Sequence, residues 1–556
     1  MSFFDPDRFR RRLPTSDDFR RVRHRWYRVV VLAALTGVLV GLAVALFEWI
    51  VGEGLLDWTL GLPDGLQWCA PAVGLVLAWC ALRFVGHGAS PATADEYLDA
   101  YHHRDGDLPE RDVPGRTLAS AATLGFGGAM GFEGPSIYLG AAIGSAVRRR
   151  FPRSFTAENR RLLLVAGAAA GISAIFKAPA TGAIFALEVP YQEDSASHTV
   201  VPATVAAAAS YLTYVAFYGL DRLFPSGGSP DLNARGLVGA LLVGLLAGAG
   251  ARGFAWLVRA SKRVSRSAVP VWRRLLLVGV ALTALAALTT VVFDAPLSLG
   301  PGYGAIDWTN AAERSLGLVV LLLIIRAAAT SLAIAGGGVG GVFIPLFVEG
   351  WILGTAVEVV VSSNSLLFPV IGAAAFLGAG YRTPIAAVVF VAEVTGGPGF
   401  IVPALIATAV AQLVMGRQSI TTHQLPRRVD PLERALHRPI VDAVATVPAV
   451  SPSARLADVF GDDGAASDRV AVVDDGCFVG LVESRDAIRA LRADGAAATC
   501  TDAVRPVPVH ADLGWTVGDA RELLDGGVDA LAVVDNGRFL GVVTAATILA
   551  LDRRLR

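Results

Sequence analysis

An isolated glutamate in a glycine-rich apolar stretch is the feature of this sequence that most directly indicates chemistry. Glu133 lies in GFGGAMGFEGPSIYLG (125–140), and Pro135 suits the first turn of a helix that begins there. Close helix packing would explain the glycines but not the acid, because a carboxylate inside a membrane is costly and normally functional. The free N–H groups and the positive dipole end of a helix N-terminus favour an anion. We therefore expect Glu133 to compete with a small anion for one place, and so to act as a gate.

A second glycine-rich stretch provides a matching element. In GGGVGGVFIPLF (336–347), the glycines leave backbone N–H groups free and Pro345 opens another helix. Two helix N-termini directed at one point would hold a dehydrated anion without a full positive charge. Passage of an ion requires binding that is favourable but weak, so this arrangement predicts an anion pathway. A dinucleotide-binding interpretation of the glycines fails, because no strand precedes them and no acidic residue follows at the required distance.

The composition indicates a membrane domain with a soluble tail. Of the 556 residues, 54% are hydrophobic and 17% are charged, which argues against a wholly soluble protein. The formal net charge of zero is an average of unlike parts. Residues 1–28 hold nine Arg and four Asp, whereas residues 430–556 hold 13 Arg and 20 acidic residues. The protein is expected in the cell membrane, and the Arg-rich start predicts that its N-terminus lies in the cytoplasm.

Long apolar runs and interrupted apolar runs alternate along the membrane domain. The interrupted stretches 117–147, 160–192 and 337–415 contain Gly or Pro every 8–12 residues. Broken backbone at membrane depth is tolerated where it is buried in protein or lines a cavity, so half-helices are expected there. The continuous runs are each long enough to cross a bilayer, and they lie at 29–52, 66–86, 199–218, 236–258, 274–293 and 315–335.

An internal repeat divides the membrane domain into two halves. GAAAGISAIFKAPATGAIFALEV (167–189) aligns with GAAAFLGAGYRTPIAAVVFVAEV (372–394) at an offset of 205, and GFEGP (131–135) aligns with GVFIP (341–345) at an offset of 210. Such repeats are usually inverted in transporters. Four pairs of residues match in register: Gly167 with Gly372, Pro179 with Pro384, Phe185 with Phe390, and Glu188 with Glu393.

A second repeat lies in the tail. AVVDDGCFVGLVESRDAI (471–488) matches AVVDNGRFLGVVTAATIL (532–549) at an offset of 61. Each copy predicts a strand, an Asp-Gly or Asn-Gly turn, a second strand and a helix. The tail is therefore expected to hold a small α/β unit twice.

These motifs together resemble the CLC family of chloride channels and chloride/proton antiporters. The resemblance rests on GFEGP, GVFIP, APATGAIFALE (178–188) and the tandem-repeat tail, and it runs from about residue 29 to the C-terminus. It implies an all-α multi-span membrane protein, a CLC-like inverted repeat of tilted and broken helices, followed by a C-terminal α/β pair of CBS domains. It also implies a homodimer with one pore in each subunit.

The resemblance assigns roles to individual residues. Glu133 would be the gating glutamate. The N–H groups of Val342 and Phe343 would line a central anion site, and those of Phe132, Glu133 and Gly134 would line an outer one.

Three departures from the family pattern bear on mechanism. His87, in Gly86-His87-Gly88-Ala89-Ser90, stands where the family has an anion-coordinating Ser, and Thr421 falls near the family's anion-coordinating Tyr. After ALE the antiporters commonly carry a second Glu that delivers protons, and here that position is Val189. We therefore predict a chloride channel, with a chloride/proton antiporter as the alternative. Glu188 and Glu393 are expected to cap or tie helix ends, although Glu188 or water could also carry protons.

The ligand of the tail is left open. CBS domains that bind adenosine phosphates usually offer a Thr or Ser and, three residues later, an Asp. The first repeat has Glu483 and Asp486, and the second has Thr544 and Thr547, so neither repeat carries both groups. Asp486 and Thr544 are weak candidates for an adenine nucleotide site, and the alternative is a structural dimerisation module.

Other classes of protein are disfavoured. None of the eight His is followed by Glu, which excludes the HExxH helix of an intramembrane zinc protease. A divalent-cation transporter would need clustered acids in the membrane. The four Cys are scattered without a CxxC pair, so no metal site is expected. We expect no enzymatic activity, no required cofactor and no nucleic-acid partner, with chloride as the transported ion.

The predicted domains follow from these features. They are an Arg-rich cytoplasmic segment (1–28), the membrane domain (29–425, with halves at about 29–218 and 236–415), a linker (426–438), a first CBS domain (439–495) and a second (496–556).

Overall fold

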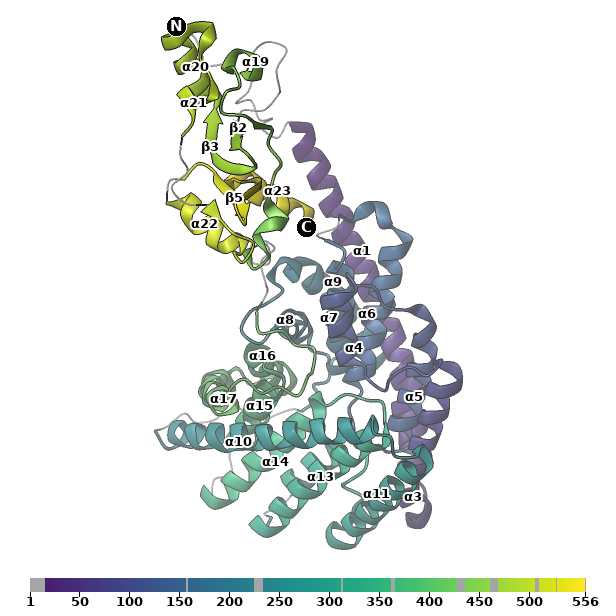
Figure 1. Cartoon of the computed structure of the whole chain (residues 1–556). Helices are drawn as coiled ribbons and strands as arrows, with labels where there is room; N and C mark the ends of the chain where they lie inside the picture. Colours follow the sequence, from purple (N-terminus) through teal and green to yellow (C-terminus); the bar gives the residue numbers. More distant parts are fainter. Residues whose placement is uncertain are drawn as a thin grey trace. The chain divides into compact units, whose positions relative to one another are not determined.

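The structure is a computed structural model whose ribbon is drawn in Figure 1. It forms two compact units, Met1–Arg428 and Val429–Arg556, and each is described by itself. Each predicted domain lies partly outside the described residues, and the largest shares are 1–15 of the Arg-rich start and 428–435 of the linker. The described residues are 16–156, 159–224, 234–311, 314–361, 366–427, 436–460, 469–505, 510–526 and 528–555.

The first unit is built from helices of very different lengths. They are α1 (Ser16–Glu48), η1 (Trp49–Leu56), α2 (Asp57–Leu60), α3 (Asp64–Cys80), η2 (Ala81–Val85), α4 (Ala94–His103), η3 (Glu110–Asp112), α5 (Val113–Gly125), α6 (Glu133–Arg150), η4 (Pro152–Ser154), α7 (Leu162–Phe176), α8 (Pro179–Glu188), η6 (Ser197–Thr199), α9 (Val200–Tyr218), α10 (Ala234–Ser265), α11 (Val271–Phe293), α12 (Tyr303–Asn310), α13 (Leu316–Gly336), α14 (Phe343–Val361), α15 (Leu367–Tyr381), α16 (Pro384–Thr395), η7 (Pro398–Phe400) and α17 (Ile401–Met415).

Eight helices in the described part of the chain are long and apolar enough to cross a membrane. Six of them coincide with the six predicted apolar runs, which confirms those predictions. The other two, Phe343–Val361 and Pro398–Met415, lie inside a stretch that we predicted to be interrupted. The mostly helical membrane fold is therefore confirmed, with longer elements in the second half than the Gly and Pro pattern predicts.

The helix breaks occur at equivalent positions of the two halves. The helix α7 ends before Lys177, which has a positive φ of 52°, and α8 begins at Pro179. In the second half α15 ends before Arg382, at φ 58°, and α16 begins at Pro384. A left-handed residue ends one helix and a proline opens the next, so the chain breaks into two short helices at the equivalent place of each half.

Glycines let neighbouring helices of each half approach to backbone contact. A Cβ on Gly140 would overlap the carbonyl group of Gly167, and a Cβ on Gly167 would overlap that of Gly140. The equivalent glycines, Gly350 and Gly372, block one another in the same way. The helix pairs α6–α7 and α14–α15 therefore pack alike, which extends the repeat from sequence to packing.

The tail folds around a six-stranded sheet of order β1-β2-β3-β6-β5-β4. The predicted turns at Asp475-Gly476 and Asn536-Gly537 both have positive φ at both residues, as type I′ hairpins require. The repeated α/β unit is confirmed. Its elements are η8 (Ile440–Ala443), β1 (Ala449–Val450), α19 (Leu456–Phe460), β2 (Arg469–Asp474), β3 (Cys477–Glu483), α20 (Ser484–Asp494), η9 (Gly495–Ala497), α21 (Cys500–Ala503), β4 (His510–Ala511), α22 (Val517–Asp525), β5 (Leu531–Asp535), β6 (Arg538–Val543) and α23 (Ala545–Leu555).

The tail has one hydrophobic core around each repeat. Each core also contains a residue from the predicted domain of the other repeat. Ile440, near the start of the tail, packs in the core of the second repeat with Val517 and Leu531. Cys500, in the second predicted domain, packs in the core of the first repeat with Val470. The two predicted CBS domains thus share segments across the boundary at residue 496, and their limits stay a prediction.

Candidate anion site

The N-termini of α6 and α14 are joined by a pair of backbone hydrogen bonds. The N–H of Gly131 donates to the carbonyl of Gly341 at 2.9 Å, and the N–H of Gly341 donates to the carbonyl of Gly131 at 2.7 Å. These glycines are equivalent in the repeat and pair antiparallel, as expected at a local twofold axis. The two motifs therefore meet at one point inside the membrane unit.

Glu133 places its carboxylate at the N-terminus of the opposite helix. Its side chain is fully buried, and Oε1 accepts hydrogen bonds from the N–H of Phe343 at 2.6 Å and of Ile344 at 3.4 Å. Oε2 is buried and has no hydrogen-bond partner among the described residues. A carboxylate oxygen thus stands at the free N–H groups of α14, where the sequence predicts a bound anion.

Glycine is needed on both sides of this carboxylate. A Cβ on either Gly131 or Gly341 would overlap the side chain of Glu133. A Cβ on Gly134 would lie 2.6 Å from the backbone nitrogen of Gly341. The glycines around Glu133 therefore make room for a compact, anion-sized group between the two helix ends.

Two hydroxyl groups that the sequence pattern does not predict lie beside this point. Thr93 precedes α4, and its Oγ1 donates to the carbonyl of Gly340 at 3.4 Å. Tyr381 is the last residue of α15, is 1% exposed, lines the cavity described below, and has its hydroxyl beside the N–H of Val342. Tyr381 takes the repeat position that Phe176 holds in the first half, and this difference was the signal available in the sequence.

A cavity reaches this point from one side of the unit. Its wall carries the basic side chains of Lys262 and Arg266 and the acidic side chain of Asp95, and the excess of positive charge favours entry of an anion. Lys262 Nζ also lies 2.6 Å from Asp95 Oδ2. The other lining residues include Pro91, Thr93, Met130, Ile334, Gly340, Gly341, Val342, Tyr381, Ile420 and Thr421.

The predicted anion-binding residues fall into two groups. Phe132 is the buried N-cap of α6, and Gly134, Val342 and Phe343 lie at the helix ends that meet. His87, in contrast, lies in an exposed turn at φ 52° and does not line the cavity.

Two further predicted positions are buried. Thr421 lines the cavity, but its hydroxyl donates to Gln424 Oε1 at 3.4 Å and lies 3.0 Å from Ser419 Oγ. Val189 is buried at the C-cap of α8. Its apolar side chain offers no group that could take up a proton.

Glu188 is the last residue of α8 and Glu393 lies near the end of α16, and each caps the N-terminus of the helix that carries the other. Glu393 accepts from the backbone N–H groups of Ala180 at 2.9 Å and Thr181 at 2.8 Å, at the start of α8. Glu188 accepts from the N–H of Ala386 at 2.9 Å, at the start of α16. The prediction that these acids cap helix ends is confirmed. The reciprocal capping follows the twofold relation of the repeat.

The candidate nucleotide-binding residues of the tail have protein partners. Asp486 Oδ1 accepts from Arg505 at 2.6 Å, and Glu483 pairs with Arg469 at 2.9 Å. Thr544 and Thr547 bond reciprocally at the start of α23, with distances of 3.0 and 3.2 Å. These contacts stabilise the fold, and the nucleotide site stays a prediction.

Comparison with known proteins agrees with the geometry. A family model described as "Voltage gated chloride channel" matches residues 73–416, and a CBS domain model matches residues 500–553. A ClcB-like chloride channel protein of Ralstonia nicotianae is 27% identical over 425 residues, 72% of this chain and 97% of that protein. The H(+)/Cl(-) exchange transporter ClcA of Yersinia pestis bv. Antiqua is 28% identical over 416 residues, 70% of this chain and 85% of that protein.

Two solved structures share the fold. One is a CLC-type fluoride/proton antiporter, with a TM-score of 0.63 and 24% identity over 74% of this chain and 100% of that one. The other is a eukaryotic CLC transporter, with a TM-score of 0.59 and 19% identity over 93% of this chain and 97% of that one. Because the family model matches more than half of its residues, the chain belongs to the voltage gated chloride channel family, the CLC family.

Proposed function

We propose that this protein is a chloride/proton antiporter in which Glu133 carries the proton and alternates with the anion at one site. The sequence predicted a channel, with the antiporter as the alternative. We now favour the alternative. Relatives that are named H(+)/Cl(-) exchange transporters support it. The observation that carries the proposal is the hydrogen bond of 2.6 Å from the Phe343 N–H to Glu133 Oε1.

The geometry gives a reason for alternation. As an anion, the Glu133 carboxylate is held by the N–H groups and dipole of α14, and chloride cannot occupy the same space. Protonation removes that charge and weakens the attraction, so chloride can replace the side chain. The side chain then exchanges its proton when it is displaced, and each chloride that takes the site is linked to a proton moving the other way.

Protons need a route that does not use the position of Val189. The aromatic rings of Phe176, Phe185 and Tyr381 surround Phe343, with ring centres 5.1, 5.3 and 6.1 Å from it. The rings of Phe176 and Phe185 are apolar, whereas the cavity is lined by the hydroxyl-bearing side chains of Thr93 and Tyr381. We infer that protons reach Glu133 through water in the cavity between Thr93 and Tyr381.

The proposal includes orientation and assembly. The Arg-rich start favours a cytoplasmic N-terminus, and we propose that the acidic tail lies on the same side of the membrane. The homodimer implied by the resemblance belongs to the same proposal. Crosslinking in membranes tests the assembly, and protease accessibility in sealed vesicles tests the orientation.

The decisive experiment uses purified protein in sealed vesicles with a chloride gradient and no proton gradient. An antiporter should build up a proton gradient across the membrane as chloride runs down its own gradient. The variant Glu133→Gln should keep chloride movement and lose proton movement. Chloride flux without any proton movement in the unmodified protein would instead establish a channel.

A further inference from the structure

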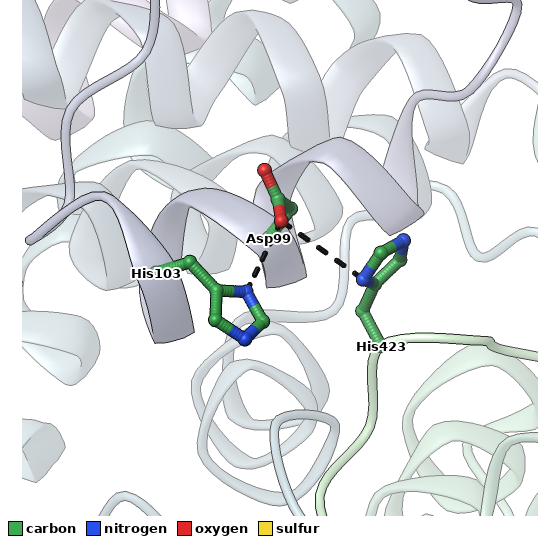
Figure 2. A group of neighbouring side chains, drawn as sticks. All are labelled: Asp99, His103 and His423. Atoms are coloured by element: carbon green, nitrogen blue, oxygen red, sulfur yellow. Dashed lines mark hydrogen bonds and ion pairs between the residues drawn. The ribbon is translucent and has the colours of Figure 1, made fainter.

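Three side chains from distant parts of the sequence converge at the surface of the membrane unit. Figure 2 shows Asp99 and His103 on α4, and His423 on the segment that follows α17. Asp99 Oδ1 lies 3.1 Å from His103 Nδ1 and 4.0 Å from His423 Nδ1. One ligand atom from each residue lies within 4.8 Å of the other two.

We propose that Asp99, His103 and His423 form a binding site for a divalent first-row transition metal such as Zn²⁺. Two imidazoles and a carboxylate are ligands that zinc prefers, and three protein ligands leave a fourth position for water. Tetrahedral zinc with bonds of about 2.1 Å needs ligand atoms about 3.4 Å apart. The distances of 3.1 and 4.0 Å lie on either side of that value, and all three ligand atoms lie within 4.8 Å of one another, so side-chain rotation is enough to bring them to this spacing.

The surroundings of Asp99 orient it for this role. Its other oxygen, Oδ2, pairs with Arg104 at 2.7 Å, and the same guanidinium pairs with Glu96 at 2.9 Å. Oδ1 is therefore the oxygen that faces the histidines. A partner that fixes a carboxylate in this way is typical of the groups behind a metal ligand.

A simple contact within one helix does not account for the whole cluster. His103 lies one turn after Asp99, and an i,i+4 ion pair on a helix surface would explain that contact alone. His423 comes from more than 300 residues later, yet it also approaches Asp99 Oδ1. The adjacent His102 faces away, with Nε2 2.9 Å from the carbonyl of Pro190.

Metal binding would join two walls of the cavity. The segment that carries His423 also carries Thr421, which lines the cavity, and the N–H of Thr422 bonds Asp95 Oδ1 at 3.3 Å. Asp95 lies on α4, one turn before Asp99. A metal ion at Asp99 would therefore fix α4 to this segment beside the cavity and slow any movement of the cavity wall.

The test is a calorimetric titration of the full-length protein in detergent with Zn²⁺. The unmodified protein should show one saturable site per chain that His103→Ala and His423→Ala each weaken by at least roughly tenfold. The control is His510→Ala, which removes an exposed histidine of the tail and should leave the titration unchanged. Hydrogen exchange in residues 416–427 should slow when zinc is added to the unmodified protein.

Two results of the zinc titration would overturn the proposed site. Equal zinc binding by the unmodified protein and the His103→Ala/His423→Ala double variant would overturn the site, as would the absence of a saturable site in the unmodified protein. Neither histidine belongs to the anion site, so chloride flux without zinc should be the same in all variants and reports correct folding. The binding readout does not depend on whether the protein is an antiporter or a channel.

Discussion

Glu133 Oε1 lies 2.6 Å from the backbone nitrogen of Phe343, which joins two motifs that stand 210 residues apart. The acid belongs to the start of α6 and the N–H to the start of α14, so each half of the repeat provides one side of the contact. Because the carboxylate already occupies the end of α14, the bound anion and the gate cannot be present there together.

Tyr381 should contribute its hydroxyl to anion binding. The variant Tyr381→Phe keeps ring packing against Phe185 and Phe343 and removes only the hydroxyl beside the Val342 N–H. A hydrogen bond contributes about 1 kcal/mol, so chloride affinity should fall about fivefold. Thr421→Val is the matched control, because the Thr421 hydroxyl bonds Gln424. A larger loss of affinity in Thr421→Val than in Tyr381→Phe would refute this assignment.

The reciprocal caps should matter for stability but not for proton transport. Glu393→Ala leaves the N–H groups of Ala180 and Thr181 without their partner and should cost about 1–3 kcal/mol of unfolding free energy. Glu188→Ala should cost a similar amount, because it removes the equivalent cap at Ala386. Unfolding by denaturant measures both. Glu188→Gln should keep proton movement in vesicles, and its loss would make Glu188 part of the proton route.

Gly350 should tolerate no larger side chain. A Cβ there would overlap the carbonyl of Gly372, so Gly350→Ala should force α14 and α15 apart and cost about 1–3 kcal/mol. Gly253→Ala in α10 is the control, because no atom lies within 4 Å of its added Cβ, and it should stabilise the helix by up to about 1 kcal/mol. The unfolding midpoint in detergent should therefore move in opposite directions. A fall of similar size in both variants would contradict the packing argument.

Acid should loosen α22 in the tail. The backbone N–H and hydroxyl of Thr516 both bond Asp519 Oδ2 at 2.8 Å and hold the pKa of this carboxyl below its usual range. The contribution is therefore present above the unfolded pKa of about 3.9 and is lost as pH falls through the lower folded value.

Hydrogen exchange tests this when it is corrected for the chemical exchange rate. Protection of α22 should decrease from about pH 5 to about pH 3 in the unmodified protein. Asp519→Asn should flatten that dependence. Asp475→Asn, in a turn where Asn536 holds the equivalent position, should not. An unchanged dependence in Asp519→Asn would assign the effect to other carboxyl groups.

The sequence predicted the parts of the site that depend on backbone and missed those that depend on side-chain placement. Glu133 and the helix start at Phe343 follow from Gly and Pro positions, because these residues determine where N–H groups are free. Tyr381 and Thr93 approach the site through the packing of α15 and α4, which no local pattern encodes. His87 was placed by motif alignment, but its turn has a positive φ and carries the side chain outward.

The helix lengths show the same limit. Gly and Pro mark possible breaks, yet α14 continues from Phe343 to Val361 through Pro345, Gly350 and Gly354. The proline lies in the first turn, and the two glycines face α15 at backbone contact. Residues that interrupt an isolated helix therefore serve packing here, and only tertiary contacts distinguish the two uses.

The Glu133 carboxylate and the anion should compete for the N-terminus of α14. Chloride titration of the purified protein at neutral pH, by calorimetry, tests this directly with Glu133→Ala beside the unmodified chain. Removing the carboxylate should tighten chloride binding by at least about tenfold, equivalent to about 1.4 kcal/mol. Chloride affinity that is unchanged or weaker in Glu133→Ala, with normal unfolding behaviour, would show that the carboxylate and the anion do not compete.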